Sequence, residues 1–183
     1  DGPLLLKAAL AHSKNTVAAK LVEGLGLDAV VDFAHRAGIV SEMPRSLSLA
    51  LGTGEVKPME LVNAYATIAA KGLQAEPILV IRVKDRNGQM LEERLGTTAV
   101  QAIRPEVSFV LGSMMRDVVE YGTGGAARAL GRPVAAKTGT AQDHRDAWFV
   151  GFTPELVAGG WRGFDSHEPM GPRETGGGAA LPA

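Results

Sequence analysis

The stretch from residue 132 to residue 164 constrains the fold most, because it holds three short apolar runs in close succession. Gly131, Pro133 and the turn residues Thr153-Pro154-Glu155 bound these runs, and short apolar runs between such residues predict β-strands. Successive strands with short connections pair antiparallel. The sequence therefore predicts an antiparallel sheet within 132–164, whose strands include residues 134–136, 147–152 and 156–161.

The first of these runs leads directly into Lys137-Thr138-Gly139-Thr140. An ammonium group and two hydroxyls can bind an anion, and a glycine without a side chain lets a substrate backbone lie close against the strand. We therefore interpret this stretch as one wall of a candidate active site. The competing interpretation is a strand end with an exposed lysine, since a lone Lys-Thr-Gly occurs by chance in many chains.

A phosphate-binding loop is a second alternative, because Gly131 precedes Lys137 and Thr138 at the spacing of the Walker A motif. However, Ala136 stands where that motif needs its second glycine, whose backbone approaches the phosphate. Such a loop also leads from a strand into a helix, whereas Gly139 and the strand-like run 147–152 follow here. The sequence thus disfavours a phosphate-binding loop.

The chain has 183 residues, about the length of one domain, and its composition excludes several classes of function. The net charge is -1 and no Lys/Arg cluster is evident, so a nucleic-acid partner has no electrostatic support. No apolar run of about 18 residues could span a bilayer. Without cysteine there is no disulfide, thiolate ligand or cysteine nucleophile. His35 has no partner at metal-like spacing on its helix, and His144 and His167 show no serine or carboxylate arrangement that would require a base, so we expect neither a metal nor a cofactor.

Residues 1–72 and 105–121 are predicted to be mainly helical. The expected helices are residues 3–11, 16–24, 28–37, 58–70 and 105–121, with Asn15 and Asp28 as N-caps of the second and third. Ser13 and Asn15 then lie on a tight loop between two apolar helices, where their polar groups can point outward. The alternative is that Ser13 and Asn15 serve only as caps.

Two further segments have a predicted local structure. Residues 77–93 form a hairpin around Asn87-Gly88, the strongest short hairpin signal, and we interpret this hairpin as scaffold. Residues 122–127 form a flexible link whose glycines admit a close backbone approach. Arg162 interrupts an apolar strand, so we place it on the outward face of the sheet. The Asp1-Gly2-Pro3 start, without Met, and the end after a glycine run lead us to expect a piece of a longer polypeptide.

Ser13-Lys14-Asn15 and Lys137-Thr138-Gly139-Thr140 have the form and order of two motifs of the penicillin-binding proteins and serine β-lactamases, Ser-x-Asn and Lys-Thr-Gly. The runs at 46–70, 121–127, 137–151 (with Arg-Asp-Ala-Trp-Phe-Val-Gly at 145–151) and 174–177 add to this likeness. Together they make nearly the whole chain resemble the transpeptidase domain of class A (bifunctional) penicillin-binding proteins. The resemblance implies an α+β fold, a penicillin-binding-protein/serine β-lactamase-like antiparallel sheet with helices, incomplete at both ends here.

The resemblance also implies an activity, peptidoglycan cross-linking. A serine attacks the D-Ala-D-Ala end of a stem peptide, releases D-Ala and passes the acyl group to an amine of a neighbouring strand. The expected partners are stem peptides, β-lactams that mimic them, and an upstream remainder of the polypeptide with a glycosyltransferase domain. The expected location is extracytoplasmic, at the periplasmic face of the inner membrane, through an anchor outside this chain.

By the same resemblance, each motif residue receives a role. Lys137 supplies charge for the terminal carboxylate of the substrate, and the hydroxyls of Thr138 and Thr140 bind that carboxylate. Gly139 keeps the strand accessible, and the backbone N–H of Thr140 is a donor of the oxyanion hole. Ser13 relays a proton to the leaving amine, while the Asn15 amide holds the substrate.

The family's nucleophile motif, Ser-x-x-Lys, is missing. None of the seven serines of the chain has lysine three positions later. We therefore expect this chain alone to be inactive toward penicillin. The missing motif supports one alternative, a catalytically silent scaffold fragment. Among the enzymes, a D,D-carboxypeptidase or β-lactamase-like hydrolase is a further alternative.

Overall fold

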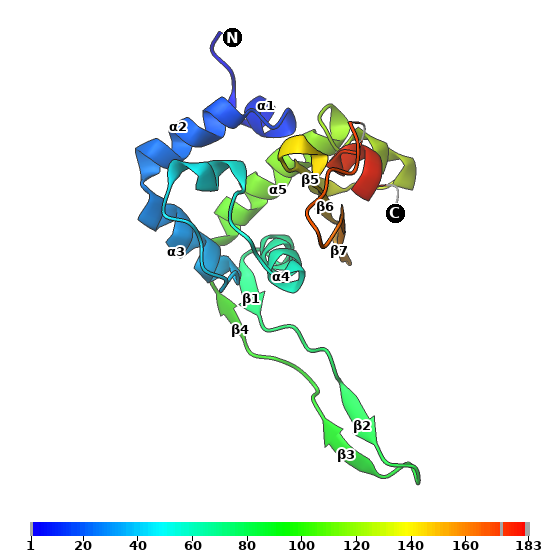
Figure 1. The fold of residues 1–183 in the computed structure, drawn as a ribbon. Coiled ribbons are helices and arrows are strands. Elements are labelled where there is room, and N and C mark those ends of the chain that lie inside the picture. Colours follow the sequence, from blue (N-terminus) through cyan, green and yellow to red (C-terminus); the bar gives the residue numbers. More distant parts are fainter. Residues whose placement is uncertain (1, 173, 182–183) are drawn as a thin grey trace.

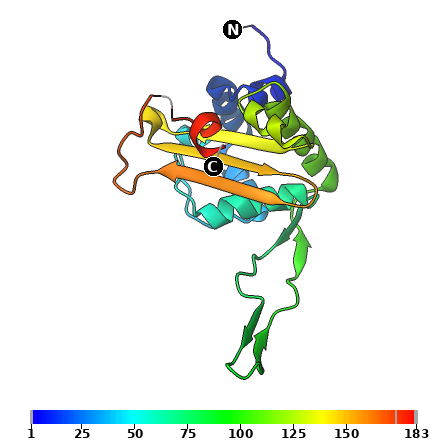
Figure 2. The same cartoon turned by 90° about the vertical axis from the view of Figure 1, so that its right-hand side faces the viewer.

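A three-stranded antiparallel sheet forms one side of the body in the computed structural model, which describes residues 2–172 and 174–181 (Figure 2). Its strands are β5 (Ala135–Thr140), β6 (Asp146–Phe152) and β7 (Val157–Gly163), in the order β5-β6-β7. Thr138 is directly opposite Phe149, and Lys137 opposite Val150. The antiparallel sheet predicted from sequence is confirmed, and β5, which carries Lys137, lies at an edge of this three-stranded sheet.

Helices supply the rest of the body (Figure 1). Proline opens both of the long helices at their first turn, where a missing N–H leaves no hydrogen bond unmade. The α-helices are α1 (Leu6–Ala11), α2 (Asn15–Leu25), α3 (Leu27–Ala37), α4 (Pro58–Ala69) and α5 (Pro105–Glu120). Short 3-10 or π turns are η1 (Leu47–Leu51), η2 (Gly125–Leu130), η3 (Gln142–His144) and η4 (Gly176–Ala180). Helices with an antiparallel sheet confirm the predicted α+β class.

Three small apolar clusters hold these elements together. One joins α5 to the sheet through Val119 and Ala136, with Ala127 of η2 beside them. A second joins α3 to α4 through Ala37 and Ala64, and a third packs η4 against β6. Burial of α5 against β5 fixes the strand that carries the Lys-Thr-Gly-Thr run. Among residues 2–172 and 174–181, no helix is both long and apolar enough to cross a membrane.

A long arm projects from the body between α4 and α5 (Figure 1). Its base is the pair β1 (Leu73–Ala75) and β4 (Ala99–Gln101), and its tip is the pair β2 (Arg82–Lys84) and β3 (Met90–Glu93). The Asn87-Gly88 turn is at the tip as predicted, but the strands there are shorter than residues 77–93 suggested. The sequence prediction missed β1 and β4, because each is only three residues long and its partner is distant in sequence.

The starts of the first three helices differ from the predictions by one to three residues, whereas α4 and α5 begin at Pro58 and Pro105 as predicted. Helix α1 begins at Leu6, since Pro3 and Leu4 are not helical. Helix α2 begins at Asn15, and Lys14 is its N-cap because the Lys14 carbonyl accepts the first hydrogen bonds of the helix. Helix α3 begins at Leu27 after Gly26. The capping roles predicted for Asn15 and Asp28 are therefore wrong, because both lie inside the first turn.

Candidate active site

Ser13 and Lys137, which are 124 positions apart in the sequence, are in direct contact. The Lys137 ammonium donates a hydrogen bond to Ser13 Oγ at 2.8 Å and another to the carbonyl of Thr138 at 2.6 Å. Ser13 lies between α1 and α2 with a φ of 51°, in the left-handed region that is uncommon for residues other than glycine. The contact therefore joins the helical part of the chain to the edge strand of the sheet.

Burial lowers the pKa of the Lys137 ammonium below its usual value of 10.5. Loss of water around a cation disfavours the charged form, so a proton on this lysine is easier to transfer than one on a solvated lysine. The Ser13 hydroxyl, whose oxygen is 2.8 Å from the Lys137 nitrogen, could take part in such a transfer. Because Ser13 Oγ already accepts from Lys137, the Ser13 proton is free to be donated to a third group.

Asn15 lies two residues beyond Ser13, at the first position of α2, and is exposed. Within the described residues no hydrogen bond is made by its side chain, neither to the helix nor to Ser13 or Lys137. Its amide therefore offers two N–H donors and one carbonyl acceptor to an external group. The structure brings Ser13 and Lys137 together and leaves Asn15 open beside them.

The two hydroxyls of the Lys-Thr-Gly-Thr run each have a partner in the chain. Thr138 is 8% exposed, and its Oγ1 is 2.6 Å from Thr123 Oγ1. Thr140 Oγ1 accepts a hydrogen bond from the backbone N–H of Gly176 at 3.1 Å. An N–H can only donate, so the Thr140 proton points elsewhere. Both hydroxyls lie on one face of β5, because side chains alternate along a strand.

Gly139 is approached by Gly176 of η4. A Cβ added to Gly176 would lie 2.4 Å from the carbonyl oxygen of Gly139, closer than real Cβ atoms come. Glu174, two residues earlier, is held by Arg162 at 3.3 Å, and its carbonyl contacts Nδ1 of His144 at 3.1 Å. Arg162 is exposed, as predicted. These contacts seat the segment around Gly176 against the end of β5.

The link after α5 contributes to the site in a way that the sequence prediction only partly anticipated. A close backbone approach is confirmed at Gly122, where an added Cβ would collide with the carbonyl of Ala11. The hydroxyl of Thr123, the next residue, forms the hydrogen bond with the hydroxyl of Thr138. Instead of a flexible link, the segment continues as the 3-10 helix η2. The glycine pattern indicated the approach, but no sequence signal pointed to the Thr123 hydroxyl.

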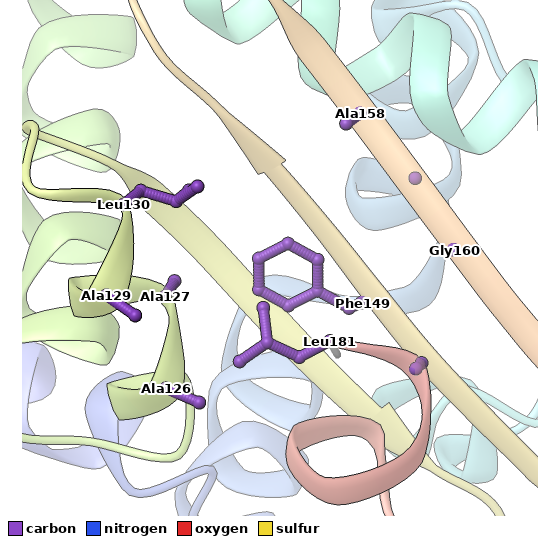
Figure 3. Close-up of a pocket in the computed structure, with 10 residues that line it drawn as sticks. Ala126, Ala127, Ala129, Leu130, Phe149, Ala158, Gly160 and Leu181 are labelled. Carbon is purple, nitrogen blue, oxygen red and sulfur yellow. The ribbon is translucent and has the colours of Figure 1, made fainter. Parts of the chain in front are cut away.

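A separate apolar cavity of 630 Å³ lies where η2 and η4 face the sheet (Figure 3). Phe149 and Leu181 project into it, and the other lining residues are Ala, Gly and Leu. Such a lining offers no side-chain group for acid, base or anion chemistry. Across residues 2–172 and 174–181, His, Asp and Glu form no group of three that could hold a metal ion.

A family model described as the penicillin binding protein transpeptidase domain matches residues 1–158. Penicillin-binding protein 1A of Neisseria gonorrhoeae is 38% identical over 188 residues, which cover 100% of this chain and 24% of that protein. The Aquifex aeolicus (strain VF5) protein of the same name is 40% identical over 181 residues, which cover 99% and 25%. The chain thus spans about a quarter of the length of the curated relatives it matches.

Solved structures agree with these relatives. Penicillin-binding protein 1A from Haemophilus influenzae has a TM-score of 0.91 and 26% identity, covering 100% of this chain and 33% of that chain. PonA1 from Mycobacterium tuberculosis, in complex with penicillin V, has a TM-score of 0.81 and 32% identity, covering 98% and 53%. The resemblance to a class A penicillin-binding protein is confirmed, and this chain belongs to the penicillin-binding protein transpeptidase family.

Proposed function

We propose that this chain supplies the carboxylate-binding and proton-handling groups of a serine D,D-transpeptidase that cross-links peptidoglycan. The donor is the D-Ala-D-Ala end of a stem peptide, and β-lactams occupy the same site. The 2.8 Å contact between Lys137 and Ser13 carries this proposal, because it joins the two motifs that the family resemblance pairs. Support also comes from the family membership and from PonA1, a relative whose structure contains penicillin V.

Recognition of the substrate carboxylate falls to β5 in this proposal. The Lys137 ammonium provides positive charge, and the hydroxyls of Thr138 and Thr140 donate hydrogen bonds. Hydrogen bonds to an ionised acceptor are stronger than neutral ones, so three such groups suit a carboxylate. The Thr140 hydroxyl is suited to donate because its oxygen already accepts from Gly176. Gly139 leaves room for the substrate backbone along the strand.

Proton transfer follows from the Lys137–Ser13 contact. When the serine nucleophile attacks the carbonyl of the penultimate D-Ala, its hydroxyl proton passes to a base on the same upstream polypeptide and a C–O bond forms. The C–N bond then breaks, and the D-Ala amine needs a proton. Ser13 donates its hydroxyl proton to that amine and regains one from Lys137, whose pKa is lowered by burial. The backbone N–H of Thr140 serves the oxyanion hole, and the Asn15 amide holds the substrate. The acyl group then passes to an acceptor amine, and the proton that this amine loses returns through Ser13 to Lys137.

The nucleophile is proposed to come from polypeptide outside this chain, because no serine here has lysine three positions later. The same longer polypeptide would carry a glycosyltransferase domain and act outside the cytoplasm, at the periplasmic face of the inner membrane. The missing motif also favours a second candidate, a catalytically silent scaffold. A D,D-carboxypeptidase or β-lactamase-like hydrolase would use the same groups with water as the acceptor.

Intact-mass spectrometry after incubation with penicillin tests the proposal. We expect no adduct on this chain and one adduct on a longer chain that carries Ser-x-x-Lys upstream. Substituting Lys137 by Ala in the longer chain should slow adduct formation, whereas the same change at the exposed Lys84 of the arm should not. Stoichiometric labelling of the short chain would refute the assignment of the nucleophile. No reaction with either chain would favour the scaffold.

A further inference from the structure

Thr123 lies at the junction of the three segments that build the candidate site. Its backbone N–H donates to the carbonyl of Ala11, two residues before Ser13, at 3.1 Å. Its hydroxyl contacts Thr138 on β5 at 2.6 Å. A Cβ added to Gly177 would lie 2.7 Å from the Thr123 carbonyl oxygen, so η4 packs directly on this residue. The position of Thr123 is therefore fixed from three sides.

The hydroxyl contact between Thr123 and Thr138 matters because a hydroxyl proton rotates about its C–O bond. Each hydroxyl has one proton and two lone pairs, so one of the two must donate to the other. If Thr138 donated to Thr123, its only proton would be turned away from a substrate. If Thr123 donates, the Thr138 proton is left for an external acceptor, in the same way that Gly176 leaves the Thr140 proton free.

We propose that Thr123 is a positioning residue for carboxylate recognition: its hydroxyl donates to Thr138 and directs the Thr138 proton toward the substrate carboxylate. The inference rests on the proposed function and adds a residue outside both sequence motifs. A chain of two hydroxyls ending on an anion also strengthens each bond, because each donor is polarised by the next acceptor. Thr123 itself is exposed, so water competes for its hydroxyl and the effect is moderate.

The test compares penicillin with its uncharged methyl ester on the longer chain that carries the nucleophile. Thr123→Val should slow acylation by penicillin about three- to tenfold, the loss of one hydrogen bond, and leave acylation by the ester unchanged. Thr123→Ser should restore the original preference for the carboxylate. Thr98→Val is the matched control, because Thr98 is an exposed residue of the arm, directly before β4, and is far in sequence from the site.

Coupling with Thr138 separates positioning from direct binding. If Thr123 acts through Thr138, then adding Thr123→Val to Thr138→Val causes no further loss. A further loss of acylation rate in the double variant would overturn the positioning role. An equal loss of rate with penicillin and with its ester would also overturn it, because such a loss indicates a structural defect. The ratio of the acylation rate with penicillin to the rate with its ester does not depend on the fraction of the protein that is folded. If Thr123→Val does not fold, Thr123→Ala takes its place. Failure of the unaltered longer chain to react would instead refute the proposed function.

Discussion

Gly122 sets the distance between the end of α1 and the end of α5, and replacing it with alanine should disturb the site. An added Cβ would lie 2.2 Å from the carbonyl oxygen of Ala11 and 2.9 Å from that of Val118. Real Cβ atoms stay at least 3.0 Å from other heavy atoms, so the Ala11 carbonyl must move by 0.8 Å, the difference between 3.0 and 2.2 Å. Both neighbours are backbone atoms, which cannot rotate away.

This displacement is transmitted to Ser13, two residues beyond Ala11. If Ser13 moves 0.8 Å away from Lys137, their 2.8 Å hydrogen bond becomes 3.6 Å, which is no longer a hydrogen bond. A misplacement of about 1 Å in a catalytic arrangement can reduce a rate about 10²-fold. The variant should also lose about 1–3 kcal/mol of stability, the usual cost of an added group in a packed place.

Acylation of the longer chain by penicillin, followed with time at several concentrations, measures this effect. Gly122→Ala should react about 10²-fold more slowly. Gly124→Ala is the matched control in the same loop, since its Cβ would meet nothing nearer than 3.4 Å and its φ is -95°. The control should react within about twofold of the original chain, because no neighbour has to move. Equal rates for Gly122→Ala and the original chain would refute the coupling between this glycine and the site.

Three further outcomes are expected. First, the acylation rate should fall as the pH rises, and the fall should begin below pH 10.5. Burial lowers the pKa of Lys137, and the neutral amine no longer attracts a carboxylate. A rate that stays constant up to pH 10.5 would contradict this expectation. Second, hydrogen bonding from Ser41, first its side chain and then its backbone, and from the N–H of Val40 lowers the pKa of Glu60. The Glu60 carboxylate therefore stabilises the fold fully above pH 4.5 and less as the pH falls through its lowered pKa, so Glu60→Gln should show a smaller loss in urea midpoint between pH 7 and pH 3. Third, Thr67 is 1% exposed and donates to the carbonyl of Ala37 at 2.9 Å, so Thr67→Val should lower the free energy of unfolding by about 1–2 kcal/mol and Thr67→Ser by less.

Local patterns in the sequence were sufficient to predict the sheet and to locate the two motifs. Alternating turn and apolar residues located β5, β6 and β7, and Asn87-Gly88 located the tip of the arm. The pairing of the two motifs came only from the family resemblance, and the direct contact between Ser13 and Lys137 came from the structure, because composition and periodicity say nothing about residues so far apart. The roles given to these residues and to Asn15, Thr138, Gly139 and Thr140 stay predictions.

The parts that sequence reasoning missed share a physical cause. The strands β1 and β4 are three residues long, too short to show a period, and they pair only because the chain returns to the body there. The start of α2 was misplaced because Asn15 is a good cap, yet the carbonyl of Lys14 opens the helix. The contact between the Thr123 and Thr138 hydroxyls arises from tertiary packing, which a turn-like sequence does not reveal.

The arm enters and leaves the body at a single point. The carbonyl of Gly72 accepts hydrogen bonds from the N–H groups of Ala102 at 2.9 Å and Ile103 at 3.2 Å, so about thirty residues form a loop closed at its base. A change at the tip, near Asn87 and Gly88, is mechanically separated from Ser13 and Lys137 by this closure. The tip is therefore the natural place for a fluorescent label or an affinity tag, which could follow the protein while leaving its candidate site undisturbed.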